Sequence, residues 1–208
     1  VFVARHRSAH LVCVSQDRTI GDSITFTCSR AMAVAVGDID GDGNEDIVVA
    51  CRESYGDSES SWVYWGSDSG FNDSERTRLE SNRACDVVVG DLDGNGLDDI
   101  LLCQNHTSES FTTDSFVYLG QRDRGLTVPI TISAEDPRRA FITRVPGRET
   151  PDLLFINHYS GKIFEVNPTI FYGGADGFSP ERSENVFGVG SVEAVCCDLN
   201  DDGFVDLV

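Results

Sequence analysis

An acidic stretch that recurs along the chain restricts the possible fold more than any other feature. Residues 37–48 read GDIDGDGNEDIV, and the related stretches GDLDGNGLDDIL and CDLNDDGFVDLV begin at Gly90 and Cys197. The leading aspartates are Asp38, Asp91 and Asp198, so the first interval is 53 residues and the second is 107, almost two such periods. A fourth copy is expected near residue 144, where the sequence is RVPGRETPDLLF. We therefore interpret the chain as four repeats, one of which has lost its acidic loop.

The segments around each acidic stretch predict short strands. The first stretch lies between the apolar runs AMAVAVG and DIVVAC, and an aromatic segment with a glycine hairpin, WVYWGSDSGF, and a polar run, ERTRLE, follow it. Runs of this kind, bounded by Gly, Asp and Ser, are typical of strands, and no segment has a helical period. Four strands in about 53 residues are typical of a β-propeller blade. The predicted fold class is therefore all-β, a β-propeller of four-stranded blades.

The phase of the repeats defines the predicted organisation. Residues 1–208 form one array, with successive repeats at 1–46, 47–99, 100–152 and 153–208. Two arrangements stay open. A four-bladed ring could close by pairing residues 191–197 with the N-terminal strands, or the repeats are consecutive blades of a larger propeller or array, which we favour. Because the chain opens directly on the apolar VFVA, we also expect its natural N-terminus to lie upstream.

The acidic loops predict calcium sites. Oxygen-bearing side chains occupy positions 1, 3, 5 and 9 of each loop, and position 7 could add a backbone carbonyl. Alternate residues of a tight loop converge on one point, and calcium takes six to eight oxygen ligands. An all-oxygen set disfavours zinc and copper. The predicted ligands are Asp38, Asp40, Asp42, Asn44 and Asp46 in the first loop, Asp91, Asp93, Asn95, Leu97 and Asp99 in the second, and Asp198, Asn200, Asp202, Phe204 and Asp206 in the third.

Neither a plain acidic turn nor an EF-hand accounts for these loops. A solvated turn would suffice for one copy, because Asp-Gly and Asn-Gly are common turn formers, but not for three copies with the same spacing. An EF-hand needs a glutamate at position 12, where the first two loops have Val49 and Leu102.

The chain resembles the FG-GAP or VCBS repeat family, the integrin-alpha-like β-propellers. The residues that carry this resemblance are VAVGDIDGDGNEDIVV, VVVGDLDGNGLDDILL and VCCDLNDDGFVDLV, together with the hairpins YWGSDSGF and FYGGADGF. The resemblance implies Ca²⁺ held at positions 1, 3, 5, 7 and 9, on one rim of a propeller that usually has seven blades. It also implies an extracellular module for cell adhesion, ligand binding or assembly.

The repeat at 144–152 departs from this pattern. Arg144, Pro146 and Arg148 occupy ligand positions, whereas Asp152 keeps the position-9 aspartate. We expect no calcium there, so that about three ions bind in total. We predict instead that Asp152 pairs with one of the two arginines.

Charge and composition restrict the partners and the compartment. The formal net charge is −19, which argues against nucleic acid and anionic membranes as partners. No apolar run is long enough to insert into a bilayer. The cysteines form no CxxC pair, and we expect some of the seven to be disulfide-bonded. Asn72 and Asn105 begin N-glycosylation sequons, which together with the cysteines suit a secreted or cell-surface glycoprotein.

No catalytic constellation is present in the sequence, so we expect a non-enzymatic module with an unidentified protein or glycan ligand. Self-association into a larger assembly is also open. One alternative is a lectin-type propeller, in which the aromatic residues Trp62, Tyr64, Trp65 and Tyr172 would stack on sugars, although such residues more often pack between blades. Another alternative is an accessory domain of a secreted polysaccharide-active enzyme.

Overall fold

The structure is a computed structural model that describes residues 2–5, 8–14, 20–28, 30–52, 60–107, 109–144, 147–164 and 166–208. Within these ranges the chain is all-β: it forms nineteen strands and a single turn of 3-10 helix, Pro180–Arg182. Pro146, one of the residues singled out above, lies outside the described ranges.

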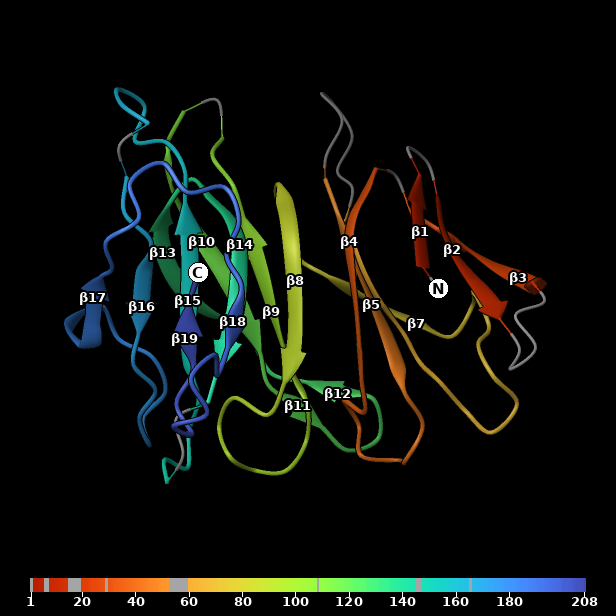
Figure 1. Cartoon of the computed structure of the whole chain (residues 1–208). Helices are drawn as coiled ribbons and strands as arrows, with labels where there is room; N and C mark the ends of the chain where they lie inside the picture. Colours follow the sequence, from red (N-terminus) through yellow and green to blue (C-terminus); the bar gives the residue numbers. More distant parts are fainter. Residues whose placement is uncertain are drawn as a thin grey trace.

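Three sheets have four antiparallel strands each, and in each the first two strands are joined by the loop of one repeat (Figure 1). The first is β4 (Ala31–Gly37), β5 (Asp46–Cys51), β6 (Ser61–Tyr64) and β7 (Arg76–Leu79). The second is β8 (Ala84–Gly90), β9 (Asp99–Gln104), β10 (Thr112–Tyr118) and β13 (Ile130–Glu135). The third is β14 (Pro137–Thr143), β15 (Asp152–Asn157), β16 (Thr169–Phe171) and β17 (Ser183–Asn185).

Smaller sheets flank these three. The N-terminal sheet is β1 (Phe2–Arg5), β2 (Ser8–Val14) and β3 (Ile20–Thr27), and the C-terminal one is β18 (Cys196–Cys197) with β19 (Asp206–Leu207). A short hairpin, β11 (Gly120–Gln121) with β12 (Gly125–Leu126), extends from β10. In the described residues β18 pairs with β19, and residues 191–197 do not pair with the N-terminal strands. The sheets therefore form an open row.

The apolar cores lie between successive sheets. All six residues of β5 are buried, because both faces of this strand are covered. Ile47, Val49 and Cys51 belong to a cluster shared with the N-terminal sheet, whereas Val48 and Ala50 belong to a cluster shared with β8–β10. This alternation follows from the two-residue period of a strand. It explains why β5 has a continuous apolar sequence and not an alternating one.

The same arrangement recurs in the next sheet. Ile100 and Leu102 of β9 face the cluster shared with β4–β7, and Leu101 and Cys103 face a third cluster shared with β14–β16. Strands β5, β9 and β15 begin at equal intervals, at Asp46, Asp99 and Asp152. The loops that precede them consequently lie at the same end of the row of sheets.

A disulfide joins two neighbouring sheets. Cys28, just after β3, is bonded to Cys51 at the end of β5, and both are buried. The expectation that some cysteines are paired is thus confirmed. Cys85 and Cys103 are free thiols in the third cluster. Among the described residues, no helix is long and apolar enough to span a membrane.

Candidate metal centre

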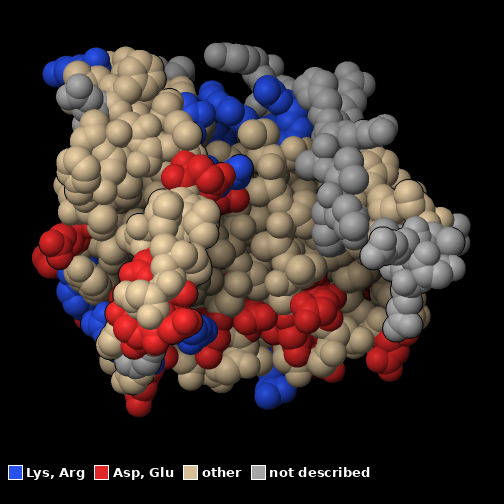
Figure 2. Space-filling view, viewed as in Figure 1, with Lys and Arg blue, Asp and Glu red and all other residues tan. Residues whose placement is uncertain are grey.

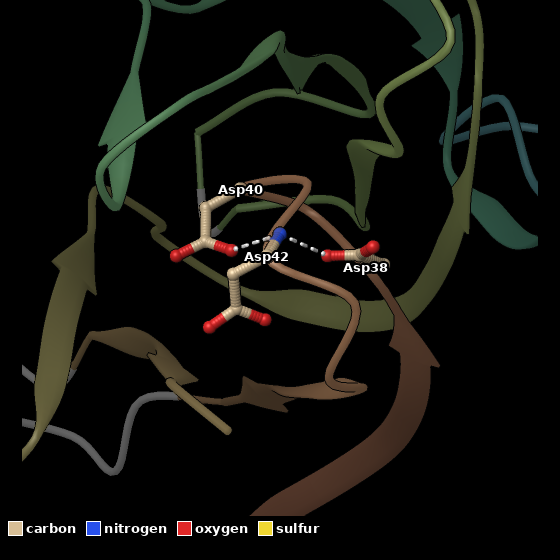
Figure 3. Close-up of side chains that lie close together, drawn as sticks. All are labelled: Asp38, Asp40 and Asp42. Carbon is tan, nitrogen blue, oxygen red and sulfur yellow. Dashed lines mark hydrogen bonds between the residues drawn. The ribbon is translucent and has the colours of Figure 1, made fainter. Parts of the chain in front are cut away.

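The first acidic loop folds around its own carboxylates. The amide of Asp42 donates to Asp38 Oδ1 at 3.0 Å and to Asp40 Oδ1 at 3.1 Å, and the amide of Gly43 donates to Asp38 Oδ2 at 3.0 Å (Figure 3). Gly43 has a φ of 90°, which a residue without a Cβ adopts easily. As a result Asp38, Asp40 and Asp42 each place one carboxylate oxygen within 4.8 Å of the others.

The other two acidic loops fold in the same way. In the second, Gly94 and Gly96 donate their amides to Asp91 at 2.7 and 3.1 Å. Its group of nearby carboxylate oxygens comes from Asp91, Asp93 and Asp99. In the third loop Asp202 and Gly203 donate their amides to Asp198 at 3.1 and 2.8 Å. Position 3 of the third loop is an asparagine, and no comparable group of three carboxylates forms in this fully described segment.

The aspartate at position 9 accepts backbone hydrogen bonds that the sequence did not indicate. Asp46 accepts the amide of Ile39 at 3.0 Å and the amide of Gly66 at 2.8 Å, one on each oxygen. It therefore ties the start of its loop to the hairpin that follows β6. In the first loop it is not part of the close carboxylate group, contrary to the expected equivalence of positions 1, 3, 5 and 9. Its share in binding an ion stays a prediction.

The equivalent aspartates repeat these contacts. Asp99 accepts the amides of Leu92 at 2.7 Å and Gly120 at 2.8 Å. Asp152 accepts the amide of Gly173 at 3.0 Å, and Asp206 accepts that of Leu199 at 2.9 Å. The glycines of the hairpins are thus functional residues that sequence reasoning missed. The signal that could have identified them is a glycine 20 or 21 residues after the position-9 aspartate in three repeats.

Burial makes these carboxylates costly to ionise. It raises the pKa of Asp46 to about 6, against the lowering effect of the Gly66 and Ile39 amides. It likewise raises the pKa of Asp99 to about 6, against the amides of Gly120 and Leu92. Burial, and then the neighbouring charge of Asp42, raises the pKa of Asp40. A cation within the loops would offset this cost, because an opposite charge at short range favours the ionised form.

In the repeat without an acidic loop, an arginine side chain lies beside the position-9 aspartate. Arg148 donates from Nη1 to both oxygens of Asp152, at 3.1 and 3.0 Å. The predicted pairing of Asp152 with an arginine is confirmed. Arg144 instead donates from Nη2 to the backbone carbonyl of Asp91 at 2.8 Å, so it reaches the neighbouring acidic loop. The guanidinium of Arg148 therefore places a positive charge beside the position-9 carboxylate of this repeat.

The structure gives the position-7 residues a role through their amides. Asn44, Leu97 and Phe204 donate their N–H groups to the side chain at position 5, at 2.7, 2.7 and 2.8 Å. That their backbone carbonyls bind calcium stays a prediction.

The remaining candidate residues differ in accessibility. Asn72 is exposed, and its side chain accepts from Ser74, so this sequon is accessible to a glycan. Asn105 is only 1% exposed, and this burial argues against a glycan on its amide. Tyr64 and Trp65 are buried in the clusters between sheets, and Arg76 covers the ring of Trp62 at 4.3 Å. Trp62, Tyr64 and Trp65 therefore pack between sheets, as is more usual for such residues. Tyr172 is half-buried and donates its hydroxyl to Glu184 at 3.0 Å, and sugar binding stays a prediction.

A comparison with family models matches residues 38–102 to the FG-GAP-like repeat. The matched segment begins at Asp38 and spans the first two acidic loops, β5 to β8 and most of β9. A comparison with curated proteins finds no match. The FG-GAP-like repeat thus accounts for both loops in which the structure brings three carboxylates together.

Proposed function

We propose that the chain is an extracellular, calcium-binding β-propeller module that serves adhesion, ligand binding or structural assembly and is not an enzyme. The observation that carries the proposal is the shared geometry of the three acidic loops, in each of which backbone amides hold alternate side-chain oxygens. The FG-GAP-like repeat at residues 38–102 supports the same assignment. The row of sheets would form part of a propeller whose blades repeat about every 53 residues.

The donor set fits a calcium ion. Within the first two loops the available groups are carboxylate and amide oxygens, the hard ligands that calcium prefers, with no sulfur or imidazole among them. When bound, the ion would supply positive charge that balances the crowded carboxylates. The residues that would hold it are Asp38, Asp40 and Asp42 in the first loop and Asp91, Asp93 and Asp99 in the second. The third loop, with Asp198, Asn200, Asp202 and Asp206, would hold the third.

The loops would act through the hairpins they contact. Asp46 and Asp99 join a loop to the hairpin of the same sheet, and the amide of Asp38 donates to Asp98 Oδ2 of the next loop at 3.0 Å. A loop ordered by an ion would therefore hold both its own sheet and the neighbouring one. This role is structural. The module's unidentified ligand would bind elsewhere on the sheets.

The extracellular assignment is supported by two features. One is the disulfide between Cys28 and Cys51. Disulfides persist in oxidising compartments and are rare in cytosolic proteins. Asn72 provides an accessible sequon. In the protein purified from its natural source, mass spectrometry is expected to find this disulfide and a glycan on Asn72. Free thiols at both cysteines, with an unmodified Asn72, would contradict the assignment.

Calorimetric titration of calcium into the metal-free protein tests the central claim. We expect about three bound ions and a melting temperature that rises with calcium. At a free calcium concentration of 100 times the dissociation constant, each site adds about 2.7 kcal/mol to the free energy of unfolding. Asp93→Asn should abolish one site, because its carboxylate belongs to the second loop's group. The matched control is Asp68→Asn, an exposed hairpin aspartate with the same charge change. Absence of binding heat and of any shift in melting would refute the proposal.

A further inference from the structure

The end of the molecule opposite the acidic loops collects arginines. The first strand of each sheet starts at this end and the second strand finishes there, since the two are antiparallel and the acidic loop joins their other ends. Arg30 and Arg83 precede β4 and β8, and Arg52 follows β5. Arg138 and Arg139 lie at the start of β14. Figure 2 shows the contrast: blue side chains gather at the upper edge of the central sheets, and red ones along the lower edge.

A cavity of about 300 Å³ opens among these arginines. Three of its lining residues, Arg52, Asn105 and His158, each directly follow the second strand of a successive sheet. Met32, Cys85 and Arg138, which also line it, each occupy the second position of a successive first strand. Equivalent positions of three repeats thus converge on one cavity. A cavity of this size is in the lower range of small-molecule sites.

The positive charge around this cavity is only partly balanced. Arg138 lies 3.4 Å from Asp136, and Arg139 lies 3.5 Å from Asp86 and 3.2 Å from Glu193. Among the described residues no acidic side chain forms an ion pair with Arg30, Arg52 or Arg83. Burial, and after it the charges of Arg83, Arg30 and Arg138, lowers the pKa of Arg52. A chain with a net charge of −19 therefore holds mutually repelling cations at one place.

Polar atoms in and beside the cavity also lack partners. Asn105 is 1% exposed, and neither its Nδ2 nor its Oδ1 has a hydrogen-bond partner within the described part of the chain. The same holds for Nε of Arg138, Nε of Arg83 and Nδ1 of His158. Buried polar groups are nearly always paired in folded proteins, so the unpaired N–H donors among these atoms call for a ligand that accepts hydrogen bonds.

We propose that this cavity binds a compact oxyanion, of the phosphate, sulfate or carboxylate type. The guanidinium groups of Arg52 and Arg138 offer forked donors that match such an anion, and their charge would be balanced by it. The Nδ2 of Asn105 and the ring of His158 add further hydrogen-bond donors from the second and third sheets. The ligand site is distinct from the calcium loops, which lie at the other end of the strands, so it does not depend on calcium binding.

Calorimetric titration of inorganic phosphate, in a buffer without other oxyanions and at constant chloride, tests the proposal. We expect saturable binding of one phosphate per chain, both in protein depleted of metal and freed of chelator beforehand and in protein with calcium present. Parallel titrations with sulfate and acetate establish which oxyanion the site prefers. Arg52→Gln combined with Arg138→Gln should weaken the preferred anion at least tenfold. Arg122→Gln is the control, since it removes a charge beside Gly41 at the acidic end and should leave the affinity unchanged.

A second variant keeps the test decisive if the double variant does not fold. Asn105→Leu replaces the unpaired amide with an apolar group of similar size. We expect its melting temperature to be equal to or above that of the natural chain and its affinity for the anion to fall. No saturable binding of phosphate, sulfate or acetate would overturn the proposal. The proposal would also be overturned if a folded Asn105→Leu variant, or the folded double variant, bound the anion with the same affinity as the natural chain.

Discussion

Replacing Gly120 with alanine tests whether the hairpin glycines hold the acidic loops in place. A Cβ at this position would lie 2.2 Å from the backbone oxygen of Asp98 and 2.5 Å from that of Ile39. Carbon and oxygen atoms normally approach to about 3.3–3.6 Å, so the hairpin must move by roughly 1 Å. Neither oxygen can rotate away, because both belong to the backbone.

The expected cost has two parts. Forcing extra volume into a packed site costs about 1–3 kcal/mol. The movement also lengthens the 2.8 Å hydrogen bond from the Gly120 amide to the buried Asp99, and a hydrogen bond to a charged group contributes about 1.5–3 kcal/mol. We therefore expect Gly120→Ala to lower the free energy of unfolding by about 3–5 kcal/mol, a large share of the roughly 5–15 kcal/mol of a typical domain.

Urea unfolding of metal-free protein measures this cost, with Gly90→Ala as the control. A Cβ at Gly90 would approach only the terminal carbon of the Ile142 side chain, at 3.0 Å, which can turn aside. The control should lose less than about 1.5 kcal/mol, the range of well-tolerated core changes. If Gly120→Ala and Gly90→Ala unfold at the same urea concentration, the hairpin glycine does not have the role described here.

Three further predictions concern single contacts. Arg148→Ala should lower the free energy of unfolding by about 1 kcal/mol or less, because the arginine is 44% exposed and solvent screens the pair, and calorimetry should find the number of bound calcium ions unchanged. Reducing the Cys28–Cys51 disulfide, which closes a separation of 23 residues, should cost about 3 kcal/mol in urea unfolding, and an equal stability after reduction would contradict this. Leu101→Ala should cost about 2–5 kcal/mol in the same assay, since this side chain is fully buried between two sheets. The control Val128→Ala, 86% exposed, should change stability by less than about 0.5 kcal/mol.

The sequence predicted those parts of the structure that depend on local pattern. The spacing of Asp38, Asp40 and Asp42 follows from a loop that its own amides close, so nearby residues suffice to infer it. The pairing of Arg148 with Asp152 is also local, being four residues apart. The apolar runs that follow the first two acidic loops form the strands β5 and β9, in which every residue is buried.

Features that depend on contacts between distant segments could not be predicted. The acidic loop by itself does not show that the carboxylate of Asp46 also accepts the Gly66 amide, which the fold brings to it. The sequon at Asn105 meets the sequence rule, but the residue follows directly on β9 and is buried where three sheets converge. Predicting the cavity would require knowledge that equivalent positions of successive repeats face one another. The repeat pattern alone does not reveal this.

The placement of the apolar clusters has a consequence for how the molecule unfolds. Each cluster takes its side chains from two successive sheets, so no sheet has a complete core of its own. Stability is then a sum of nearest-neighbour interfaces, and loss of one sheet exposes the face of the next sheet that was buried against it. The sheet of β4–β7 and the sheet of β8, β9, β10 and β13 each contribute to two clusters, and these two sheets are expected to exchange their amide hydrogens last. Because the Cys28–Cys51 bond fastens the N-terminal sheet to its neighbour, fraying should start from the opposite side, at β18 and β19.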